Sequence, residues 1–504
     1  MPGPSRKRSG SKVRPDLDFT LRKIFGKDSF RPVQREVIEA ALAGHDVYLQ
    51  AATSFGKSLC FQLPAVVDFG ITIVISPLLA LMSNQMAGLR AANIRVETLN
   101  SSTPMEKKDL IMDDLKSGHP MTRLLYVTPE YCLGERFRDT MKIVNGQQEL
   151  ARIAIDEAHC ISEWGHDFRT AFKELKWFKK EFPNVPMICC TATATARVRE
   201  DIITTLNLNH TTLKSFTMTT ARPNLHYEVR YTSYSEDRYT SDFLPWLRAI
   251  HTRRQTHPAR SAELLAASER PTNVSGIIYT LTRAETEHLA ARLTADGIGA
   301  KPYHAGLHSD LKAAHLAGWV ANKPGHDIMV ATTAFGMGID KANVRFVVHW
   351  SLPKSFEGYY QEAGRAGRDG KASVCRLYYS REDRDRGVAL FTREQQRNSH
   401  AAKNSSGGGM TASGRQSVEM RGRSLQALIA YCENVGACRH KLIAKYFGEE
   451  EGDGSGTAVK CEWACDWHKD PGLLKRRKEL GLADEEWCAT QRETGAYGEY
   501  DDYD

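Results

Sequence analysis

The sequence has no apolar run that approaches the roughly 20 residues a membrane-spanning helix requires. Its beginning is rich in charged residues between Ser5 and Lys12, where a secretion signal would carry an apolar core. We therefore expect a soluble, intracellular protein without a membrane partner.

Cysteine is sparse, with 11 residues scattered over 504, and most of them lie in apolar, strand-like runs. Such positions are typical of buried free thiols. Only the cysteines near the end of the sequence stand at spacings that indicate a site.

Negative charge is unevenly distributed. The net charge is +7, but acidic residues outnumber basic ones after Glu449, so the rest of the chain is more basic than this total indicates. A basic body favours a polyanion such as nucleic acid, although many soluble proteins are mildly basic. The basic stretch 4–8 fits both a nuclear address and an ordinary solvated tail.

Patterns of closely spaced β-hairpins are also missing. Apolar β-branched runs instead alternate with helical stretches through two segments, a pattern typical of parallel α/β domains. We therefore predict an α/β protein with two doubly wound parallel sheets, followed by a small helical subdomain. The expected strands are 47–50, 71–75, 124–127, 153–155 and 187–190 in the first sheet, and 276–279, 328–331, 345–349 and 374–378 in the second.

Polar segments interrupt and flank these domains. Residues 251–272 and 398–423 are predicted to be mobile insertions, and the first 15 residues and 497–504 are predicted to be disordered. The expected organisation is a basic tail (1–18), a first α/β domain (19–215), a second (216–384), a metal-binding subdomain (385–470) and an acidic polar tail (471–504).

A phosphate-binding motif follows the first predicted strand. Residues 51–58 read Ala-Ala-Thr-Ser-Phe-Gly-Lys-Ser and fit the relaxed P-loop pattern. Backbone N–H groups in such a turn, here around Thr53, Ser54 and Gly56, point at a triphosphate. Lys57 would neutralise the β- and γ-phosphate oxygens, and Ser58 would bind Mg²⁺.

Two acidic residues follow the predicted strand 153–155. Asp156 at the end of a strand can hold Mg²⁺, and the adjacent Glu157 can orient and deprotonate the attacking water. A pair of acids at such a position is usually only a solvated cap. Together with a P-loop upstream, the pair predicts an ATPase.

The second α/β segment ends in the sequence Gln-Glu-Ala-Gly-Arg-Ala-Gly-Arg-Asp-Gly at 361–370. We expect Gln361, Arg365 and Arg368 to belong to the catalytic site, with the two arginines on one helical face. From there they would reach across a cleft and stabilise charge on the γ-phosphate. ATP binding would close the cleft, and hydrolysis would open it.

These motifs together resemble the RecQ family of superfamily 2 DNA helicases over residues of about 20–470. The resemblance implies two RecA-like domains, ATP and Mg²⁺ as cofactors, and unwinding of duplex DNA by movement 3′ to 5′ along one strand. It also implies a role in repair, recombination or replication. The matching stretches are 30–34, 51–58, 76–82, 126–130, 156–160, 161–169, 191–195, 303–307, 331–340 and 361–370.

The resemblance also assigns residues outside the P-loop. Arg31 and Gln34 should read the edge of adenine, and Asp340 should lie near the nucleotide. An aromatic-rich loop should couple DNA to ATP hydrolysis, with DNA single strands and junctions as substrate. Its side chains can stack on bases or contact phosphate, although its aromatics could instead pack in the core. The loop residues are Trp164, His166, Phe168 and Arg169.

A cysteine and histidine cluster stands near the end of the chain. Cys461, Cys465 and His468 follow Cys438 and supply four ligands suited to tetrahedral, structural zinc. RecQ proteins carry a zinc-binding subdomain here but usually end it with cysteine. Cys432 is the main rival for the fourth ligand.

The P-loop departs from the RecQ pattern, because Ser54 and Phe55 stand where glycines are usual. Slower ATP turnover or weaker ATP binding is therefore expected. The roughly 35 polar residues after the cluster are too few for a winged-helix domain, so we expect a minimal core. Three activities stay open: a 3′ to 5′ helicase aided by repair-protein partners, a DNA-stimulated ATPase without processive unwinding, or a non-catalytic DNA-binding scaffold.

Overall fold

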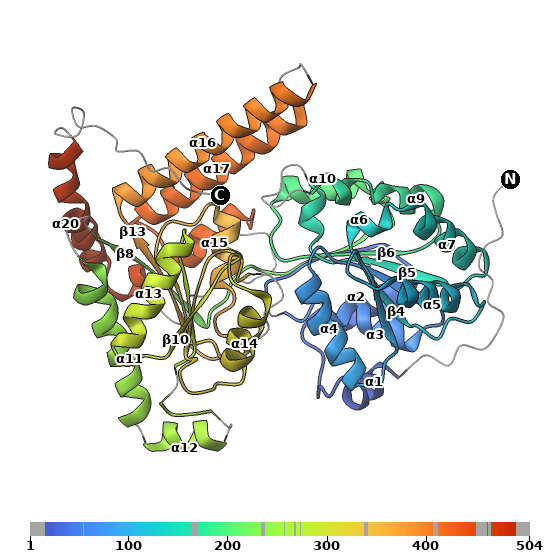
Figure 1. Ribbon diagram of the computed structural model, residues 1–504, viewed down its shortest axis with the longest axis horizontal. Coiled ribbons are helices and arrows are strands. Elements are labelled where there is room, and N and C mark those ends of the chain that lie inside the picture. The colour runs from blue at the N-terminus through green and yellow to red at the C-terminus, as the bar shows by residue number, and fades with distance from the viewer. Residues whose placement is uncertain are drawn as a thin grey trace.

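The chain forms two α/β lobes that lie side by side, and a pair of long helices projects from the second lobe (Figure 1). No helix within the described ranges is long and apolar enough to cross a membrane. The computed structural model describes residues 16–53, 55–162, 169–232, 237–256, 258–266, 269–272, 274–336, 341–406, 412–449, 461 and 465–489.

The first lobe contains a seven-stranded parallel sheet in the order β3-β4-β2-β5-β6-β1-β7. Side chains alternate along its strands, so Ile73 and Ile75 pack into one core and Val74 into another on the opposite face. The strands are β1 (Val47–Gln50), β2 (Ile71–Ile75), β3 (Val96–Leu99), β4 (Leu124–Val127), β5 (Leu150–Ile155), β6 (Met187–Thr191) and β7 (Lys214–Thr217).

Helices cover both faces of this sheet, as parallel strands with crossover connections require. They are α1 (Leu17–Lys23), α2 (Gln34–Leu42), α3 (Leu59–Val67), α4 (Leu79–Ala91), α5 (Met105–Lys116), α6 (Pro129–Cys132), α7 (Glu135–Gly146), the 3₁₀ turn η1 (Ala158–Ile161), α8 (Thr170–Lys173), α9 (Lys176–Glu181) and α10 (Ala196–Thr205).

The second lobe contains a six-stranded parallel sheet in the order β10-β11-β9-β12-β13-β8. Its strands are β8 (Leu225–Tyr231), β9 (Gly276–Tyr279), β10 (Ala300–Tyr303), β11 (Ile328–Ala331), β12 (Phe346–His349) and β13 (Ser373–Tyr379). Its helices are the π-helical turn η2 (Tyr239–Phe243), α11 (Leu244–Thr256), α12 (Pro258–Ala266), α13 (Arg283–Ala295), α14 (Ser309–Val320) and α15 (Phe356–Ala363).

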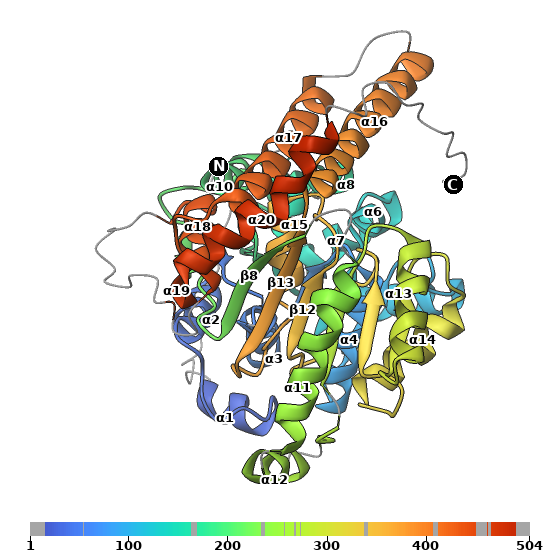
Figure 2. The ribbon, with the colours of Figure 1, turned by 90° about the vertical axis from the view of Figure 1, so that its left-hand side faces the viewer.

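The last part of the chain is helical and packs on the second lobe. Figure 2 places α18, α19 and α20 beside the edge strand β8, and the Asp466 carboxylate accepts a 2.9 Å hydrogen bond from Val229 N in that strand. The helices of this last part of the chain are α16 (Arg381–Ser406), α17 (Ala412–Glu433), α18 (Arg439–Tyr446), α19 (Asp466–Lys469) and α20 (Pro471–Ala489). The two parallel sheets and this helical part confirm the predicted fold class.

Every strand that the sequence pattern missed is an edge strand. The missed strands β3 and β7 border the first sheet, and β10 and β8 border the second. Edge strands are covered less completely than central ones, so they carry polar residues and lack a continuous apolar run. The strand β7, for example, is mostly exposed.

Both segments that we predict to be mobile insertions contain helices. In the segment 251–272, α11 continues to Thr256 and α12 follows it. In the segment 398–423, α16 reaches Ser406 and α17 begins at Ala412. The Ala, Arg, Glu and Gln residues that made these segments polar are also strong helix formers.

Helices also extend into both predicted tails. The helix α1 begins at Leu17, where Asp16 accepts a hydrogen bond from Phe19 N as an N-cap, and α20 occupies 471–489. The first 15 residues and 497–504, which we expect to be disordered, lie outside the described residues.

Candidate nucleotide and metal sites

The P-loop connects β1 to α3 at the carboxyl edge of the first sheet. The Lys57 ammonium group turns back on the loop and donates to the carbonyls of Ala51 (2.9 Å) and Ala52 (3.3 Å). Gly56 adopts a φ of +89°, whereas Phe55 is not among the residues with positive φ. The left-handed step of the loop therefore falls on glycine, so Phe55 needs no strained backbone. Ser54 lies outside the described residues.

Gln34 supports this loop from the first turn of α2. Its Nε2 donates to the carbonyls of Phe55 (3.0 Å) and Gly56 (3.3 Å), and its Oε1 accepts from Arg31 N (2.9 Å). A Cβ at position 56 would lie only 2.8 Å from Gln34 Nε2 and would displace that amide, and the φ of +89° also favours glycine. The preceding Val33 has a φ of +70°, an unusual conformation for a β-branched residue. The structure thus places the Gln34 amide on the P-loop backbone.

Asp156 and Glu157 lie at the same edge, directly after β5. The Asp156 carboxylate accepts from Gln85 Nε2 (3.2 Å) and from Glu157 N (3.1 Å), and only 5% of the residue is exposed. Glu157 adopts a φ of +54°, a conformation that non-glycine residues take mainly where the surrounding fold requires it.

Burial shifts the pKa values of both Lys57 and Asp156. The pKa of Lys57 is lowered by burial, against the neighbouring Glu157 and Asp156, which raise it. Burial likewise raises the pKa of Asp156, against Lys57, which lowers it. The enclosed ammonium and carboxylate therefore favour a ligand that carries both phosphate and a cation.

The acidic pair is linked to the strand beside it. His159 Nδ1 lies 3.4 Å from Glu157 Oε2 and 3.0 Å from the hydroxyl of Thr191, which also accepts from Thr193 N (3.2 Å). The stretches 156–160 and 191–195, which both match the RecQ pattern, therefore lie side by side. Gln85 also belongs to the site, because its amide donates to Asp156, but no motif in the sequence predicted this role.

Arg365 and Arg368 do not share a helical face, contrary to the prediction. The helix α15, which carries Gln361, ends at Ala363, and both arginines lie in the turn that follows. Gly367 has a φ of +54°, and glycine disfavours a continuing helix. The turn still contacts the first lobe, because the Thr53 hydroxyl donates to Gly364 O at 3.1 Å.

Several predicted contacts fall outside the described residues. Trp164, His166 and Phe168 of the aromatic-rich loop lie there, and so does Asp340. Arg169 is described, and its guanidinium donates to Pro77 O at 3.1 Å. It therefore ties the end of the loop to the turn after β2.

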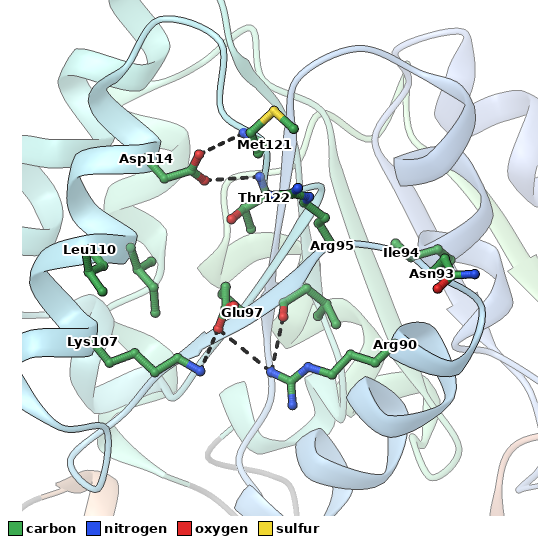
Figure 3. Close-up of a pocket in the computed structure, with 12 residues that line it drawn as sticks. Arg90, Asn93, Ile94, Arg95, Glu97, Lys107, Leu110, Asp114, Met121 and Thr122 are labelled. Atoms are coloured by element: carbon green, nitrogen blue, oxygen red, sulfur yellow. Dashed lines mark hydrogen bonds and ion pairs between the residues drawn. The ribbon is translucent and has the colours of Figure 1, made fainter.

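A groove of about 550 Å³ opens elsewhere on the first lobe, between the end of α4, the edge strand β3 and α5 (Figure 3). Glu97 and Lys107 form an ion pair of 3.0 Å across it. The strand β3 forms one edge of the sheet, and β1, which leads into the P-loop, lies next to the other edge. No predicted site residue lines this groove, so it is separate from the nucleotide site.

The predicted metal ligands converge near the start of α19. The ligand atoms of Cys438, Cys461, Cys465 and His468 all lie within 4.8 Å of one another. The sulfur atoms of Cys438 and Cys465 are 3.8 Å apart, and tetrahedral zinc with Zn–S bonds of about 2.3 Å would separate them by about 3.8 Å. Cys432 is instead buried in the core of the second lobe. The donor set thus fits zinc with His468 as the fourth ligand.

Family profiles match three consecutive parts of the chain. The DEAD/DEAH box helicase family matches residues 31–202, and the helicase conserved C-terminal domain matches 258–370. The RecQ zinc-binding family matches 393–469, which includes all four converging ligands.

Curated relatives cover most of the chain. ATP-dependent DNA helicase Q5 of Rattus norvegicus is 38% identical over 475 residues, which are 94% of this chain and 45% of that protein. RecQ-like DNA helicase BLM of Xenopus laevis is 39% identical over 447 residues, which are 88% and 30%. The chain spans less than half the length of both relatives.

Solved structures share the fold at low sequence identity. The helicase MrfA bound to DNA matches with a TM-score of 0.55 and 16% identity, over 72% of this chain and 51% of that chain. The Mycobacterium smegmatis helicase Lhr, bound to single-stranded DNA and AMP-PNP, matches with a TM-score of 0.51 and 18% identity, over 84% and 57%. These likenesses establish the two-lobed RecA-like helicase fold. The three family profiles and the curated relatives show that the chain belongs to the RecQ helicase family.

Proposed function

We propose that this chain is an ATP-dependent DNA helicase that moves 3′ to 5′ along one strand and unwinds the duplex ahead of it. One observation carries the proposal. The P-loop that carries Lys57 contacts the turn that carries Arg365 and Arg368 in the other lobe, because the Thr53 hydroxyl donates to Gly364 O at 3.1 Å. A nucleotide held by the P-loop would therefore meet both lobes, as a motor driven by ATP requires.

Each charged group has a role in hydrolysis. Lys57 holds the β- and γ-phosphates, and Glu157 orients and deprotonates the attacking water. Arg365 and Arg368 stabilise the charge that develops on the γ-phosphate, and Gln361 lies in the helix before them. Arg31 and Gln34, which lie beside the P-loop, would read the edge of adenine.

The oxygens of Ser58 and Asp156 fit Mg²⁺, which prefers hard ligands such as hydroxyl and carboxylate. Burial raises the pKa of Asp156, so a cation beside its carboxylate would stabilise the charged form. When bound, Mg²⁺ neutralises the β- and γ-phosphate oxygens.

DNA is the proposed substrate because the curated relatives are named as DNA helicases and because the body of the chain is basic. Trp164, His166, Phe168 and Arg169 would sense the single strand at a junction. Structural zinc at His468 and its three cysteines would hold the terminal helices. A nuclear role in repair or recombination, with repair proteins as partners, follows from the same relationship.

A strand-displacement assay tests the proposal. Duplexes with a 3′ or a 5′ single-stranded tail are offered to the wild type, to Lys57→Ala and to Glu157→Gln. We expect ATP-dependent displacement of the 3′-tailed duplex alone, and its loss in both variants. Glu157→Gln should still bind ATP while hydrolysis falls by about 10²–10⁴-fold.

Other outcomes distinguish the alternatives. DNA-stimulated ATP hydrolysis without displacement would establish the ATPase that does not unwind. Binding of DNA without any hydrolysis would establish the scaffold. Displacement that survives Lys57→Ala would refute the mechanism.

A further inference from the structure

Residues 218–224 connect the last strand of the first lobe, β7, to the first strand of the second lobe, β8. Arg222 in the middle of this connection is only 8% exposed. It forms no ion pair with any carboxylate in the described ranges of the chain. A buried cation that has no counter-ion is costly, so its surroundings must supply specific compensation.

The guanidinium group of Arg222 is compensated by four backbone carbonyls. Its Nη1 donates to Thr53 O and Gly364 O, both at 3.2 Å. Its Nη2 donates to Ala366 O and Gly367 O, both at 3.0 Å. One of these carbonyls belongs to the P-loop, and the other three belong to the turn that carries Arg365 and Arg368.

The two loops also touch directly at this point. The Thr53 hydroxyl donates to the same Gly364 carbonyl that accepts from Arg222. A Cβ at position 364 would lie 2.3 Å from Thr53 Oγ1, so the approach depends on glycine. Arg222 therefore completes a junction between the P-loop and the turn 364–370 that carries Arg365 and Arg368, which we call the arginine turn.

The metal-binding region also holds this connection. His440 Nε2 lies 3.3 Å from Arg222 O, and the Glu449 carboxylate accepts from Thr220 N and, at 2.8 Å, from the Thr219 hydroxyl. The Tyr360 hydroxyl of α15 donates to Thr220 O at 2.9 Å. Arg222 and its neighbours are thus held by the P-loop of the first lobe, by the second lobe and by the region of α18.

We infer that Arg222 is a positioning residue for ATP hydrolysis, which sets the arginine turn at the correct distance from the P-loop. The planar guanidinium can serve four carbonyls in two loops, which neither an amide nor an ammonium group can reproduce. The inference rests on the proposed ATPase function. It assigns no contact between Arg222 and the nucleotide.

The kinetic test uses Arg222→Gln and Arg222→Lys. We expect kcat for ATP hydrolysis to fall at least about tenfold in Arg222→Gln, because misplaced arginines act on the transition state. The affinity for a fluorescent ADP analogue should change less, since Gln34 still holds the P-loop. Arg222→Lys should recover part of kcat, because an ammonium keeps the charge and some of the hydrogen bonds.

Arg152→Lys is the matched control, because Arg152 is also buried, at 1% exposed, but binds Asp68 within the first lobe. A double-mutant cycle with Arg368→Ala then tests the route. If Arg222 acts through Arg368, adding Arg222→Gln to Arg368→Ala should lower kcat by less than it does in the wild type. Unchanged kcat in Arg222→Gln, fully additive losses, or an equal loss in Arg152→Lys would each overturn the inference.

Hydrogen exchange separates this inference from the proposed function. Amides of 51–58 and 364–370 should exchange faster in Arg222→Gln than in the wild type, and Arg152→Lys should leave them unchanged. If the wild type hydrolyses no ATP, the proposed function fails. Exchange then decides whether Arg222 still joins the two loops, and unchanged exchange would refute the junction.

Discussion

Gln34 shows how much of the nucleotide site depends on a single neutral side chain. Its amide bonds two successive P-loop carbonyls and also accepts from Arg31 N, so it fixes the loop against the start of α2. Only 3% of Gln34 is exposed, which means that water cannot replace these bonds cheaply when they are lost.

Gln34→Ala should weaken ATP binding. Each lost hydrogen bond is worth about 0.5–1.5 kcal/mol, so we expect the dissociation constant for ATP to rise about tenfold. The exposed Glu39 on the same helix offers a control, because Glu39→Ala removes only a 3.6 Å ion pair with Arg35. Equal affinities of Gln34→Ala and Glu39→Ala in a fluorescence titration would contradict the role of Gln34.

At the scale of elements, α20 packs so closely against β8 that no side chain fits at Gly481. A Cβ at Gly481 in α20 would lie 2.8 Å from Tyr231 Cβ and 2.9 Å from the Tyr231 carbonyl. Such distances are too short for any side chain, so the helix can cover the sheet edge only with glycine at this position.

Gly481→Ala should therefore force α20 away from β8. Overpacking of this kind costs about 1–3 kcal/mol, and hydrogen exchange of 471–489 measures the lost local stability. Gly472→Ala is the matched control in the same helix, because its Cβ would meet only Asp470 Oδ1 at 3.5 Å. It should leave exchange unchanged or slow it, because alanine favours helix. Equal effects of the two variants would contradict the packing argument.

The metal cluster gives a second prediction at this scale. His468→Ala should weaken zinc binding by about 100-fold or more, because removing even an outer partner of a ligand costs about 10–100-fold. His468→Cys should keep one zinc per chain, since cysteine is an equally competent ligand. Metal content after dialysis against a chelator measures both.

Cys432→Ala completes that comparison. Cys432 lies in the core of the second lobe and apart from the converging ligands, so its substitution should leave zinc content unchanged. Loss of zinc in Cys432→Ala but not in His468→Ala would reverse the assignment of the fourth ligand.

Charge acts at the scale of the whole molecule. Because acidic residues are concentrated after Glu449, the two lobes carry more positive charge than the total of +7. If DNA is the substrate, its affinity should fall about 10²-fold or more between roughly 50 and 200 mM salt, as phosphate contacts release counterions. Fluorescence anisotropy with a single-stranded oligonucleotide measures this dependence. An oligonucleotide with an uncharged backbone is the control, and equal salt dependence of the two would contradict the prediction.

The sequence by itself determined the chemistry and the central strands. Residues 51–58 and 156–157 can be identified because phosphate binding needs neighbouring residues in a fixed order. The central strands can be identified because they are buried on both faces and so must be continuously apolar. The same two facts made the fold class predictable.

The tertiary structure decided what depends on neighbours far along the chain. The edge strands, the turn that carries Arg365 and Arg368, and the partners of Gln34 could not be read from local pattern. Arg222 binds Thr53 O, 169 positions earlier in the chain, and Gly364 O, 142 positions later. The pattern of neighbouring residues cannot predict such a contact, because the contact exists only after both lobes have folded and come together.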